Sequence, residues 1–290
     1  MAASTSRKVV LIMGIANQKS IAWSCMEKFL QKDWYVIYTV QNEKIGSQVE
    51  AMLKRSSFPD GHQNSILGGY SCDVTDRASM DQFFHRSLPD TLQQQSQPLS
   101  LHAVIHSLAF ASNLKTPLLE TTKHSFLEAH EISSYSLIEV ARESLPFLRN
   151  QTCSDGENYT ECSRSITTLS YLGATHAIPG YNVMGPAKAS LESVVRGLAV
   201  DLRERSSYPI RVNAVRAGPL PTISSKGGIT GFDLMRRDVE NKSPLGNVTL
   251  RQVADSIYHV AAEAHGMTGQ SINIDGGYSI VAGPSMGDLL

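Results

Sequence analysis

The chain has 290 residues, of which 41% are hydrophobic and 18% charged, and its 26 Lys and Arg nearly balance its 27 Asp and Glu. This length and composition fit one large α/β domain, so residues 1–290 are treated as a single domain. The near-zero net charge provides no field that would draw the chain onto nucleic acid or an anionic membrane, and neither is expected as a partner.

The four cysteines, Cys25, Cys72, Cys153 and Cys162, form no CxxC pair and no cluster with histidine, so neither a metal site nor a dithiol site is expected. A bridge between Cys153 and Cys162 is the alternative to a fully reduced chain. The first residues, MAASTSRK, lack the apolar core of a signal peptide, and no apolar run reaches the ~18 residues of a membrane helix. We expect a cytoplasmic protein, or one of an organellar matrix if a presequence has been removed.

Short β-rich runs alternate with longer runs of helical period, a pattern typical of a doubly wound α/β fold with a parallel sheet and helices on both faces. Seven strands are predicted, at Lys8–Met13, Trp34–Val40, Ser65–Tyr70, Leu101–His106, Ser165–Leu169, Ile210–Ala214 and Ser271–Ile274. Helices are predicted at Ser20–Lys32, Lys44–Arg55, Arg77–Arg86, Lys123–Leu148, Val183–Arg205 and Leu250–Glu263. Three polar segments are predicted to be solvated loops, at Ser56–Asn64, Pro89–Pro98 and Asn150–Ser163.

The segment GIANQKSIAW, from Gly14 to Trp23, follows the first predicted strand and opens the first helix. In a doubly wound sheet this turn faces a pyrophosphate, which backbone N–H groups and the helix dipole hold. Gly14 permits a tight turn and a close approach, but it stands alone where the common fingerprint has three glycines. Ser20 either caps the helix or reaches a phosphate oxygen. A simple strand-to-helix turn is the competing interpretation.

Polar residues also follow the next strands. Gln41 stands where many dinucleotide folds place an acid for the ribose diol, and it has no adjacent arginine to pair a 2′-phosphate, which favours NADH over NADPH. Asp73 and Val74 end the third strand, where they would contact an adenine; alternatively Asp73 caps the following helix. His102 and His106 are too far apart along a strand to share a metal, so both are expected to be core or surface residues.

The segment SYLGATHAIPGYNVMGPAKASL places Tyr181 ten residues after Tyr171 and Lys188 seven residues after Tyr181. If Tyr181 lies at the mouth of a helix, seven residues turn the chain through about 700°, so Tyr181 and Lys188 project from nearly one face. The ammonium then favours a phenolate, or the phenol donates a hydrogen bond to an oxygen that gains charge. An amphipathic face with a solvated lysine is the alternative. Because Pro186 has no N–H, the helix is predicted to start close to Val183, with Tyr181 in the last loop residues or first turn.

These motifs together resemble the short-chain dehydrogenase/reductase superfamily, and within it the enoyl-acyl-carrier-protein reductase branch. That branch has Tyr-x6-Lys and a first turn Gly-x5-Ser-Ile-Ala, where the common form has Tyr-x3-Lys. The segments that carry the resemblance run from Val9 to Ile280 and include GIANQKSIA, QNEK, CDV, HSLAFA, AHEISSYS, PGYNVMGPAKASLE, RVNAVRAGPL and DGGYS. The resemblance implies a Rossmann-type fold and reduction of trans-2-enoyl thioesters in type II fatty acid synthesis.

The resemblance also assigns roles to residues. Tyr181 would hold the thioester carbonyl oxygen, Lys188 would bind the nicotinamide ribose, and Tyr171 would act as a proton donor or a pocket wall. The remaining cofactor positions are Gly14, Ile15, Ser20, Ile21, Gln41, Asp73, Val74, Ser107, Leu108, Leu220 and Thr222. The remaining substrate positions are Ala109, Met184, Ile229 and Phe232.

The resemblance further implies a lid over the acyl chain, at residues 219–241, and an acyl carrier protein as partner. Ile229, Phe232 and Met235 would form the apolar inner side of the lid, and an ordinary surface helix is the alternative. Candidate docking residues for the carrier are Arg203, Arg205, Arg236, Arg237 and Lys242. The family implies a homotetramer, to which the C-terminal YSIVAG would contribute.

Two other functions fit parts of the pattern. A carbonyl reductase of the same fold, acting on ketones or 3-oxoacyl thioesters, is disfavoured by the Tyr-x6-Lys spacing. A nucleotide-sensing module without catalysis is disfavoured by the presence of Ser20, Tyr171, Tyr181 and Lys188.

Overall fold

Seven parallel strands form one sheet with the order β3-β2-β1-β4-β5-β6-β7. The computed structural model describes residues 7–56, 58–95, 99–149, 163–206 and 208–283. The strands are β1 (Val9–Met13), β2 (Tyr35–Val40), β3 (Ile66–Ser71), β4 (Leu101–His106), β5 (Arg164–Ser170), β6 (Ile210–Ala217) and β7 (Ser271–Ile274). Every pairing of neighbouring strands is parallel, which confirms the doubly wound sheet predicted from the sequence.

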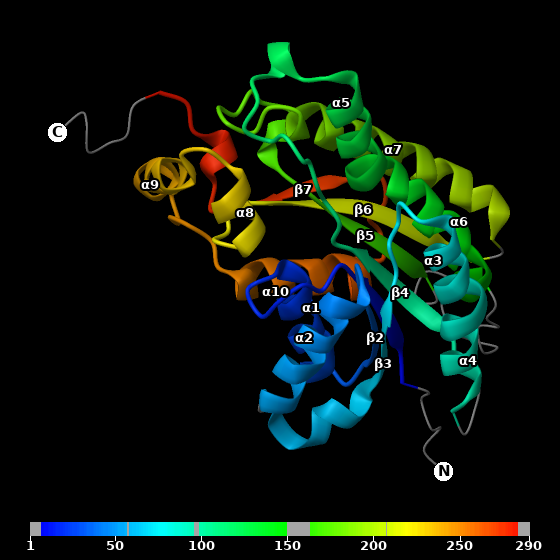
Figure 1. Cartoon of the computed structure of the whole chain (residues 1–290). Coiled ribbons are helices and arrows are strands. Elements are labelled where there is room, and N and C mark those ends of the chain that lie inside the picture. The colour runs from blue at the N-terminus through cyan, green and yellow to red at the C-terminus, as the bar shows by residue number, and fades with distance from the viewer. Residues whose placement is uncertain (1–6, 57, 96–98, 150–162, 207, 284–290) are drawn as a thin grey trace.

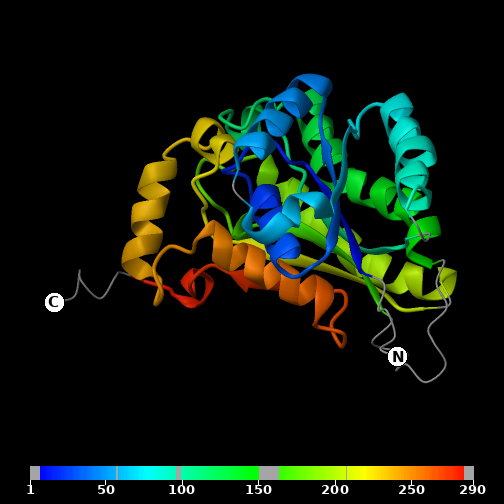
Figure 2. The same ribbon diagram turned by 90° about the horizontal axis from the view of Figure 1, so that it is seen from below.

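Helices cover both faces of the sheet (Figure 1). They are α1 (Ile21–Gln31), α2 (Glu43–Arg55), α3 (Arg77–Gln82), α4 (Leu88–Gln93), α5 (Lys123–His130), α6 (Ser136–Arg149), α7 (Met184–Arg205), α8 (Ile223–Gly228), α9 (Phe232–Lys242) and α10 (Leu250–Ala262). Helices α1, α2 and α10 pack on one face, and α3, α4, α6 and α7 pack on the other. Figure 2 shows α9 at the side of the molecule, beyond the end of the sheet.

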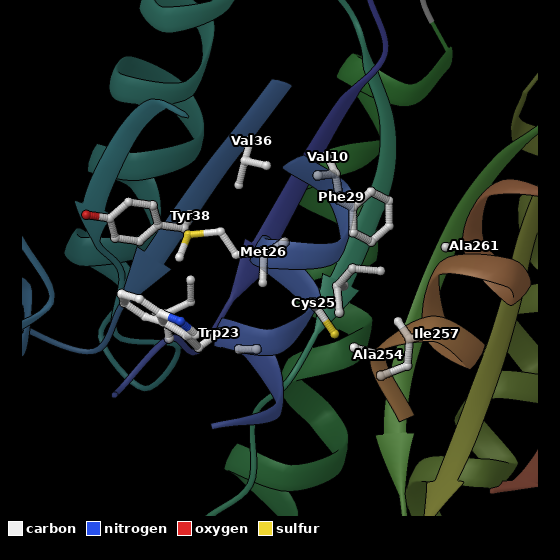
Figure 3. Close-up of a cluster of buried hydrophobic side chains, with 14 of the residues drawn as sticks. Val10, Trp23, Cys25, Met26, Phe29, Val36, Tyr38, Ala254, Ile257 and Ala261 are labelled. Atoms are coloured by element: carbon white, nitrogen blue, oxygen red, sulfur yellow. The ribbon is translucent and has the colours of Figure 1, made fainter. Parts of the chain in front are cut away.

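Alternate residues of each central strand supply the two cores. In β1, Val10 and Ile12 face α1 and α10, while Leu11 and Met13 face the opposite layer. Figure 3 shows the first core, in which Phe29 of α1 lies between the sheet and α10. All five residues of β1 are fully buried, which explains why this segment reads as a continuous apolar run rather than an alternating one.

The predicted loop Pro89–Pro98 was wrong in its first half, because α4 begins at Leu88. A proline is tolerated in the first turn of a helix, and Leu88 and Leu92 of this short helix are buried in the second core. Within Ser56–Asn64 the chain forms a 3₁₀ helix from Pro59, and the ring of Phe58 stacks on Trp23 at 6.4 Å, so this segment is also packed. Of the third loop, residues 150–162 lie outside the described residues, as do Cys153 and Cys162.

Two helices that the periodicity predicted as continuous contain a π-helical turn. The segment Phe83–Ser87 separates α3 from α4, and Glu131–Tyr135 separates α5 from α6. Such turns are frequent at functional sites, and the second one places Ser133 and Ser134 against the neighbouring helix α7. Hydrophobic spacing cannot reveal a single wide turn, because the apolar face continues on either side of it.

The order of the strands indicates the edge of the sheet at which a ligand site is expected. After β1 the chain turns to one side of the sheet through β2 and β3, and it returns to β4 on the other side of β1. Ligands of such folds bind at this switch point, beyond the carboxyl ends of the strands. The segments that follow β1 to β7 are therefore where a site is expected.

A buried arginine joins β6 to the end of α10. The guanidinium of Arg211 donates to the carbonyl oxygens of Val260 (2.7 Å), Ala261 (2.7 Å) and Ala264 (3.0 Å), and it is 3% exposed. The carbonyls of Val260 and Ala261 lie in the last turn of α10, where no N–H of the helix reaches them. The carbonyl of Ala264, just beyond the helix, also accepts from the N–H of Met267 at 3.1 Å. Arg211 thus caps α10 with a positive charge, which the helix dipole favours.

We expect Arg211→Met to lower the free energy of unfolding by about 2–4 kcal/mol, because it leaves the carbonyls of Val260 and Ala261 without a donor. Urea denaturation measures the change. Arg251→Met, at an exposed position at the start of the same helix, is the matched control and should change stability by less than about 0.5 kcal/mol. Equal losses in the two variants would contradict the capping role.

Candidate active site

The structure gathers the predicted site residues at the carboxyl edge of the sheet. Asp73 follows β3, Gln41 follows β2, Gly14 follows β1, Ser107 follows β4 and Tyr171 follows β5. Since the sheet order is β3-β2-β1-β4-β5, these five positions form one row that crosses the switch point between β1 and β4.

Gly14 is the point of closest approach between the first turn and β4. Its φ is +90°, and a Cβ at this position would lie 2.4 Å from the carbonyl oxygen of Ser107. The N–H groups of Gly14 and Ile15 both donate to the carbonyl of Thr39, at 3.1 and 3.0 Å. These two donors are thus already bonded, and the first N–H groups of α1, at Ile21 and Ala22, are the ones that lack a helical acceptor.

Ser20 caps α1, as one of the two interpretations predicted. Its hydroxyl oxygen accepts from the N–H of Trp23 at 3.2 Å, and its O–H donates to the carbonyl of Asn17 at 2.7 Å. The cap fixes Ser20 beside the positive end of the α1 dipole. A contact from Ser20 to a phosphate stays a prediction.

Gln41 and Asp73 meet across the ends of β2 and β3. The Gln41 amide donates to one Asp73 oxygen at 3.4 Å, and the other oxygen accepts from the N–H (2.9 Å) and hydroxyl (2.7 Å) of Thr75. The alternative that Asp73 caps the next helix is wrong, because Asp76 caps α3 through the N–H of Ala78. Val74, beside Asp73, is 9% exposed.

His106 is a core residue, in agreement with the expectation. It is fully buried, and its ring nitrogens bond the hydroxyls of Thr168 and Ser136, each at 2.9 Å. Burial, together with the charge of Lys188, lowers the pKa of His106 to about 3, so its ring is neutral. Within the described residues no three His, Cys, Asp or Glu side chains come together as a metal site would require.

Tyr171 and Tyr181 pack against each other edge to face, with ring centroids 4.8 Å apart and an interplanar angle of 65°. Tyr181 lies in the turn before α7, and its carbonyl accepts from the N–H of Met184, the first residue of that helix. This confirms the predicted placement. Pro186 falls in the first turn of α7, where a missing N–H leaves no helical bond unmade.

Gly173 makes room for the Tyr181 ring, a role that the sequence reasoning missed. A Cβ on Gly173 would lie 2.5 Å from Cδ1 of Tyr181 and 3.3 Å from Cδ1 of Tyr171. The conformation of Gly173 is not left-handed, so only the contact with the ring requires glycine. No motif signalled it, because the need arises from a residue eight positions away.

The surroundings of Tyr181 favour a neutral phenol. Burial, and then the nearby Tyr171, raise the pKa of Tyr181 above its ordinary value. Burial, followed by Tyr278 and Asp275, does the same for Tyr171. Of the two chemical uses considered for Tyr181, the structure thus favours the hydrogen-bond donor over the phenolate.

Lys188 reaches the same place from within α7. Its ammonium donates to the carbonyl of Leu169 at 2.8 Å, two residues before Tyr171, and the side chain is 4% exposed. Burial lowers the pKa of Lys188 to about 8, although the charge of Glu192 acts in the opposite direction. An ammonium has three donors, so two remain for other acceptors.

Residues 219–241 form two helices whose inner side chains cover the tyrosines. Phe232 is 4% exposed, and Ile229 and Met235 pack on the cluster that contains Tyr171 and Tyr181. The Tyr171 hydroxyl donates to the sulfur of Met235 at 3.2 Å. The segment is helical, as the alternative proposed, yet its apolar side faces the site.

The other predicted residues of this region lie at the start of α8 or next to the tyrosines and the segment after β4. Thr222 caps α8 by accepting from the N–H of Ser225 at 3.1 Å, and Leu220 is buried in the first core. Met184 is 4% exposed and contacts Ser133 of the π-helical turn, whereas Ala109 is exposed. Ser133, which was not predicted, also accepts from the N–H of Phe110 at 3.1 Å and so anchors the segment after β4.

Residues 14–279 match the profile of the family described as Enoyl-(Acyl carrier protein) reductase. The chain belongs to this family. The resemblance drawn from the motifs is thereby confirmed. The matched range includes Gly14, Tyr171, Tyr181 and Lys188.

Relatives of this reductase chain match it over nearly its whole length. Enoyl-acyl-carrier-protein reductase (NADH) FabI of Bacillus cereus is 34% identical over 278 residues, 94% of this chain and 97% of that protein. The NADH-named FabI of Synechocystis is 35% identical over 280 residues, 95% of this chain and 98% of that protein. A Staphylococcus aureus relative named for NADPH is 33% identical, covering 94% of this chain and 97% of that protein.

Solved structures of this family match the fold equally well. The reductase of Anaplasma phagocytophilum in complex with NAD has a TM-score of 0.80 and 32% identity, with 96% of both chains covered. The Bacillus cereus reductase with NADP⁺ and indole naphthyridinone has a TM-score of 0.79 and 33% identity, covering 95% of this chain and 97% of that one. The seven-stranded architecture is therefore that of the enoyl reductases.

Gly173→Ala should lower the free energy of unfolding by about 1–3 kcal/mol, because the new methyl group overlaps the Tyr181 ring and forces it to move. Gly197→Ala on α7 is the matched control: a Cβ there meets nothing within 4 Å, so a gain of up to about 1 kcal/mol is expected. Urea denaturation of both variants decides, and a gain in both would show that the ring does not need Gly173.

Proposed function

We propose that this chain reduces the trans-2 double bond of enoyl thioesters on acyl carrier protein with NADH, in type II fatty acid synthesis. One observation carries the proposal. The neutral phenol of Tyr181, packed on Tyr171, and the ammonium of Lys188 converge on the end of β5, beside the switch point of the sheet. This is the arrangement that the Tyr-x6-Lys spacing of the enoyl reductases anticipates.

The described residues fit a dinucleotide along the row of strand ends. Gly14 keeps the first turn free of a side chain where it passes Ser107, and the unpaired N–H groups at the start of α1 suit a pyrophosphate. Gln41 and Asp73 would hold the adenosine end, and the two remaining donors of Lys188 would hold the nicotinamide ribose. When bound there, NADH supplies the hydride that adds to the β-carbon.

Tyr181 would act on the substrate carbonyl. Negative charge collects on the thioester oxygen as the double bond is reduced, and a buried phenol that stays protonated donates its hydrogen bond to that oxygen. The donor acts in a site from which water is excluded, where the interaction is stronger than in solution. Ile229, Phe232 and Met235 would exclude the water and contact the acyl chain, and Tyr171 would orient the Tyr181 ring.

Asp73 supports the choice of NADH over NADPH. Its carboxylate lies beside Gln41, so a 2′-phosphate on the adenosine ribose would meet a negative charge. Asp73→Asn keeps the shape and an acceptor for adenine but removes this charge. The ratio of kcat/KM for NADPH to that for NADH should rise about 10-fold, which is a change of about 1.4 kcal/mol.

The matched control for Asp73→Asn is Asp76→Asn. This variant makes the same charge change three residues away, at an exposed helix cap that asparagine fills equally well. Steady-state kinetics with both nicotinamides measure the ratio. A rise in the control as large as in Asp73→Asn would assign the effect to net charge rather than to the site.

Tyr181→Phe should lower kcat for crotonyl-CoA by about 100-fold and leave the Kd of NADH within about 2-fold, because the phenol acts on the substrate and not on the cofactor. NADH oxidation and NADH fluorescence titration measure the two quantities. Tyr135→Phe, at a 45% exposed tyrosine, is the control and should change neither.

The wild-type chain also separates the alternatives. Binding of NADH without oxidation in the presence of enoyl substrates would indicate a sensing module, and turnover of 3-oxoacyl thioesters but not of enoyl thioesters would indicate a carbonyl reductase. Either result would overturn the proposed function.

We further propose that the carrier docks beside the lid and that the enzyme is a homotetramer. Arg236 and Arg237 lie on the lid helix α9 with Lys242, which pairs with Asp238 at 2.8 Å. Arg203 and Arg205 do not belong to this surface, because the 22-residue helix α7 carries them about 30 Å from its start, to the opposite edge of the sheet (Figure 1). The proposed role places the chain in the cytoplasm or an organellar matrix.

Exposed apolar side chains support the proposed tetramer. Phe126 and Leu127 of α5 are 38% and 53% exposed, and Val200 of α7 is 69% exposed, so these two neighbouring helices present apolar groups at the surface. A subunit contact over these helices would bury that surface. None of the described helices combines the length and apolarity that a membrane span requires.

A further inference from the structure

A buried carboxylate stands one helical turn after Lys188, and the proposed mechanism does not use it. Glu192 is 3% exposed, and Lys188 is 4% exposed. Because residues four apart lie on the same face of a helix, Glu192 and Lys188 both project from α7 toward the sheet. A buried carboxylate is costly unless it is paired, so its partners indicate what it does.

The partners of Glu192 come from three neighbouring strands, and Ser271 of β7 hydrogen-bonds the carboxylate together with groups of β5 and β6. Ser170 of β5 is in register with Arg216 of β6, which is in register with Asn273 of β7. The Ser170 hydroxyl donates to Oε1 of Glu192 at 2.6 Å, and Nε of Arg216 donates to the same oxygen at 2.7 Å. Nη2 of Arg216 donates to Oε2 of Glu192, and Nη1 donates to Asn273 at 3.4 Å. The guanidinium therefore clamps the carboxylate with two parallel bonds.

The clamp keeps Glu192 ionised. Burial acts to raise the pKa of Glu192, but the hydrogen bonds from Arg216 and Ser170 outweigh it and hold this pKa below its usual value. The resulting negative charge acts on Lys188, where it opposes the effect of burial on the lysine pKa. Arg216 is not among the groups that shift the pKa of Lys188 directly, so its influence on the lysine is through Glu192.

The other groups that face Lys188 contribute little charge. From β4, His106 is neutral, and from the end of β5 and the turn before α7, Tyr171 and Tyr181 are neutral as well. On the π-helical turn that packs against α7, the titratable side chains Glu131 and Tyr135 are exposed. Compared with these neutral or exposed groups, Glu192 is the buried negative charge beside the ammonium of Lys188.

We propose that Glu192, clamped by Arg216 and Ser170, is a positioning residue that holds Lys188 as an ammonium in the cofactor site and anchors the strand end that carries Tyr171. The inference rests on the proposed function for the role of Lys188 in binding the nicotinamide ribose. The effect of Glu192 on the charge of Lys188 stands apart from that role and can be measured without it.

The clamp predicts effects of opposite sign for its two charged members. Glu192→Gln keeps the size and an acceptor for Ser170 but removes the negative charge, so Lys188 should lose its proton about one pH unit lower, a tenfold change in proton affinity. Arg216→Gln leaves Glu192 without its clamp and with Lys188 as its nearest cation, so Lys188 should lose its proton at a higher pH. A purely structural pair would lower stability in both variants and shift neither titration.

The experiment follows Lys188 directly in the full-length protein. The side-chain carbon signals of ¹³C-labelled lysine are recorded by NMR between pH 6 and about 11, and the Lys188 signal is the one lost in Lys188→Arg. The Kd of NADH is measured over the same pH range by fluorescence. The alkaline loss of NADH binding should move down in Glu192→Gln and up in Arg216→Gln, in step with the lysine titration.

Glu204→Gln is the matched control, since it removes an exposed glutamate from the same helix 12 residues further along. It should leave both titrations unchanged. If Glu192→Gln does not fold, Glu192→Met with Arg216→Met replaces the pair by apolar side chains, a change that buried ion pairs often tolerate. Lys188 should then titrate at a lower pH than in the wild type, again by about one unit.

The possible failures are distinguishable. Shifts of Lys188 in the same direction in Glu192→Gln and Arg216→Gln, or no shift in either, would overturn the clamp even if the enzyme reduces enoyl thioesters. Failure of the wild-type chain to bind NADH would overturn the proposed function, while the lysine titration would still decide whether Glu192 sets the charge of Lys188.

Discussion

Three consecutive residues at the end of β5 contact the phenol and the ammonium of the proposed chemistry and the carboxylate that we propose to position the ammonium. The carbonyl of Leu169 accepts from Lys188, the hydroxyl of Ser170 donates to Glu192, and the ring of Tyr171 packs on Tyr181. Backbone atoms and short side chains at this strand end have little conformational freedom, because the parallel pairing to β6 fixes Leu169 and Ser170. A small displacement of this strand would therefore move the phenol, the ammonium and the carboxylate together.

In the parallel sheet, the residues that stabilise the fold lie on the two faces, and the residues of the proposed chemistry lie at the strand ends. Both faces of the central strands are covered by helices, so the apolar cores hold the sheet rigid and leave only the strand ends accessible. At the opposite edge, Arg211 ties β6 to the end of α10, and at the site edge Arg216 of the same strand ties β6 to α7. Two arginines on one strand thus anchor helices at its two ends, one for stability and one beside the site.

The segment proposed as a lid places apolar side chains over polar groups. Ile229 and Met235 pack on the cluster that contains both tyrosine rings, and the hydroxyl of Tyr278 donates to Asp238 of α9 at 2.7 Å, which joins the C-terminal turn to this segment. Exclusion of water by such side chains strengthens the few hydrogen bonds inside, but it also penalises buried charge. The depressed pKa of Lys188 and the raised pKa of Tyr181 are both consequences of that burial.

The sequence by itself determined the doubly wound fold class, the positions of the strand ends and the Tyr-x6-Lys motif. Each of these follows from apolar periodicity or turn residues, which act over a few positions along the chain. It also placed Tyr181 correctly before α7, since the missing N–H of Pro186 is a local constraint. It did not reveal α4, because the polar residues around Pro89 conceal the buried Leu88 and Leu92.

Only the tertiary structure decided which residues support the tyrosines and the lysine. Gly173 is needed because of a ring eight residues away, and Ser170, Glu192 and Arg216 meet because the register of β5 and β6 aligns them under α7. The protonation preferred by Tyr181 likewise follows from its burial among neighbours that are distant in the chain. Such contacts have no signature in spacing or composition, since they depend on the distance between elements in the folded molecule and not on the distance along the chain.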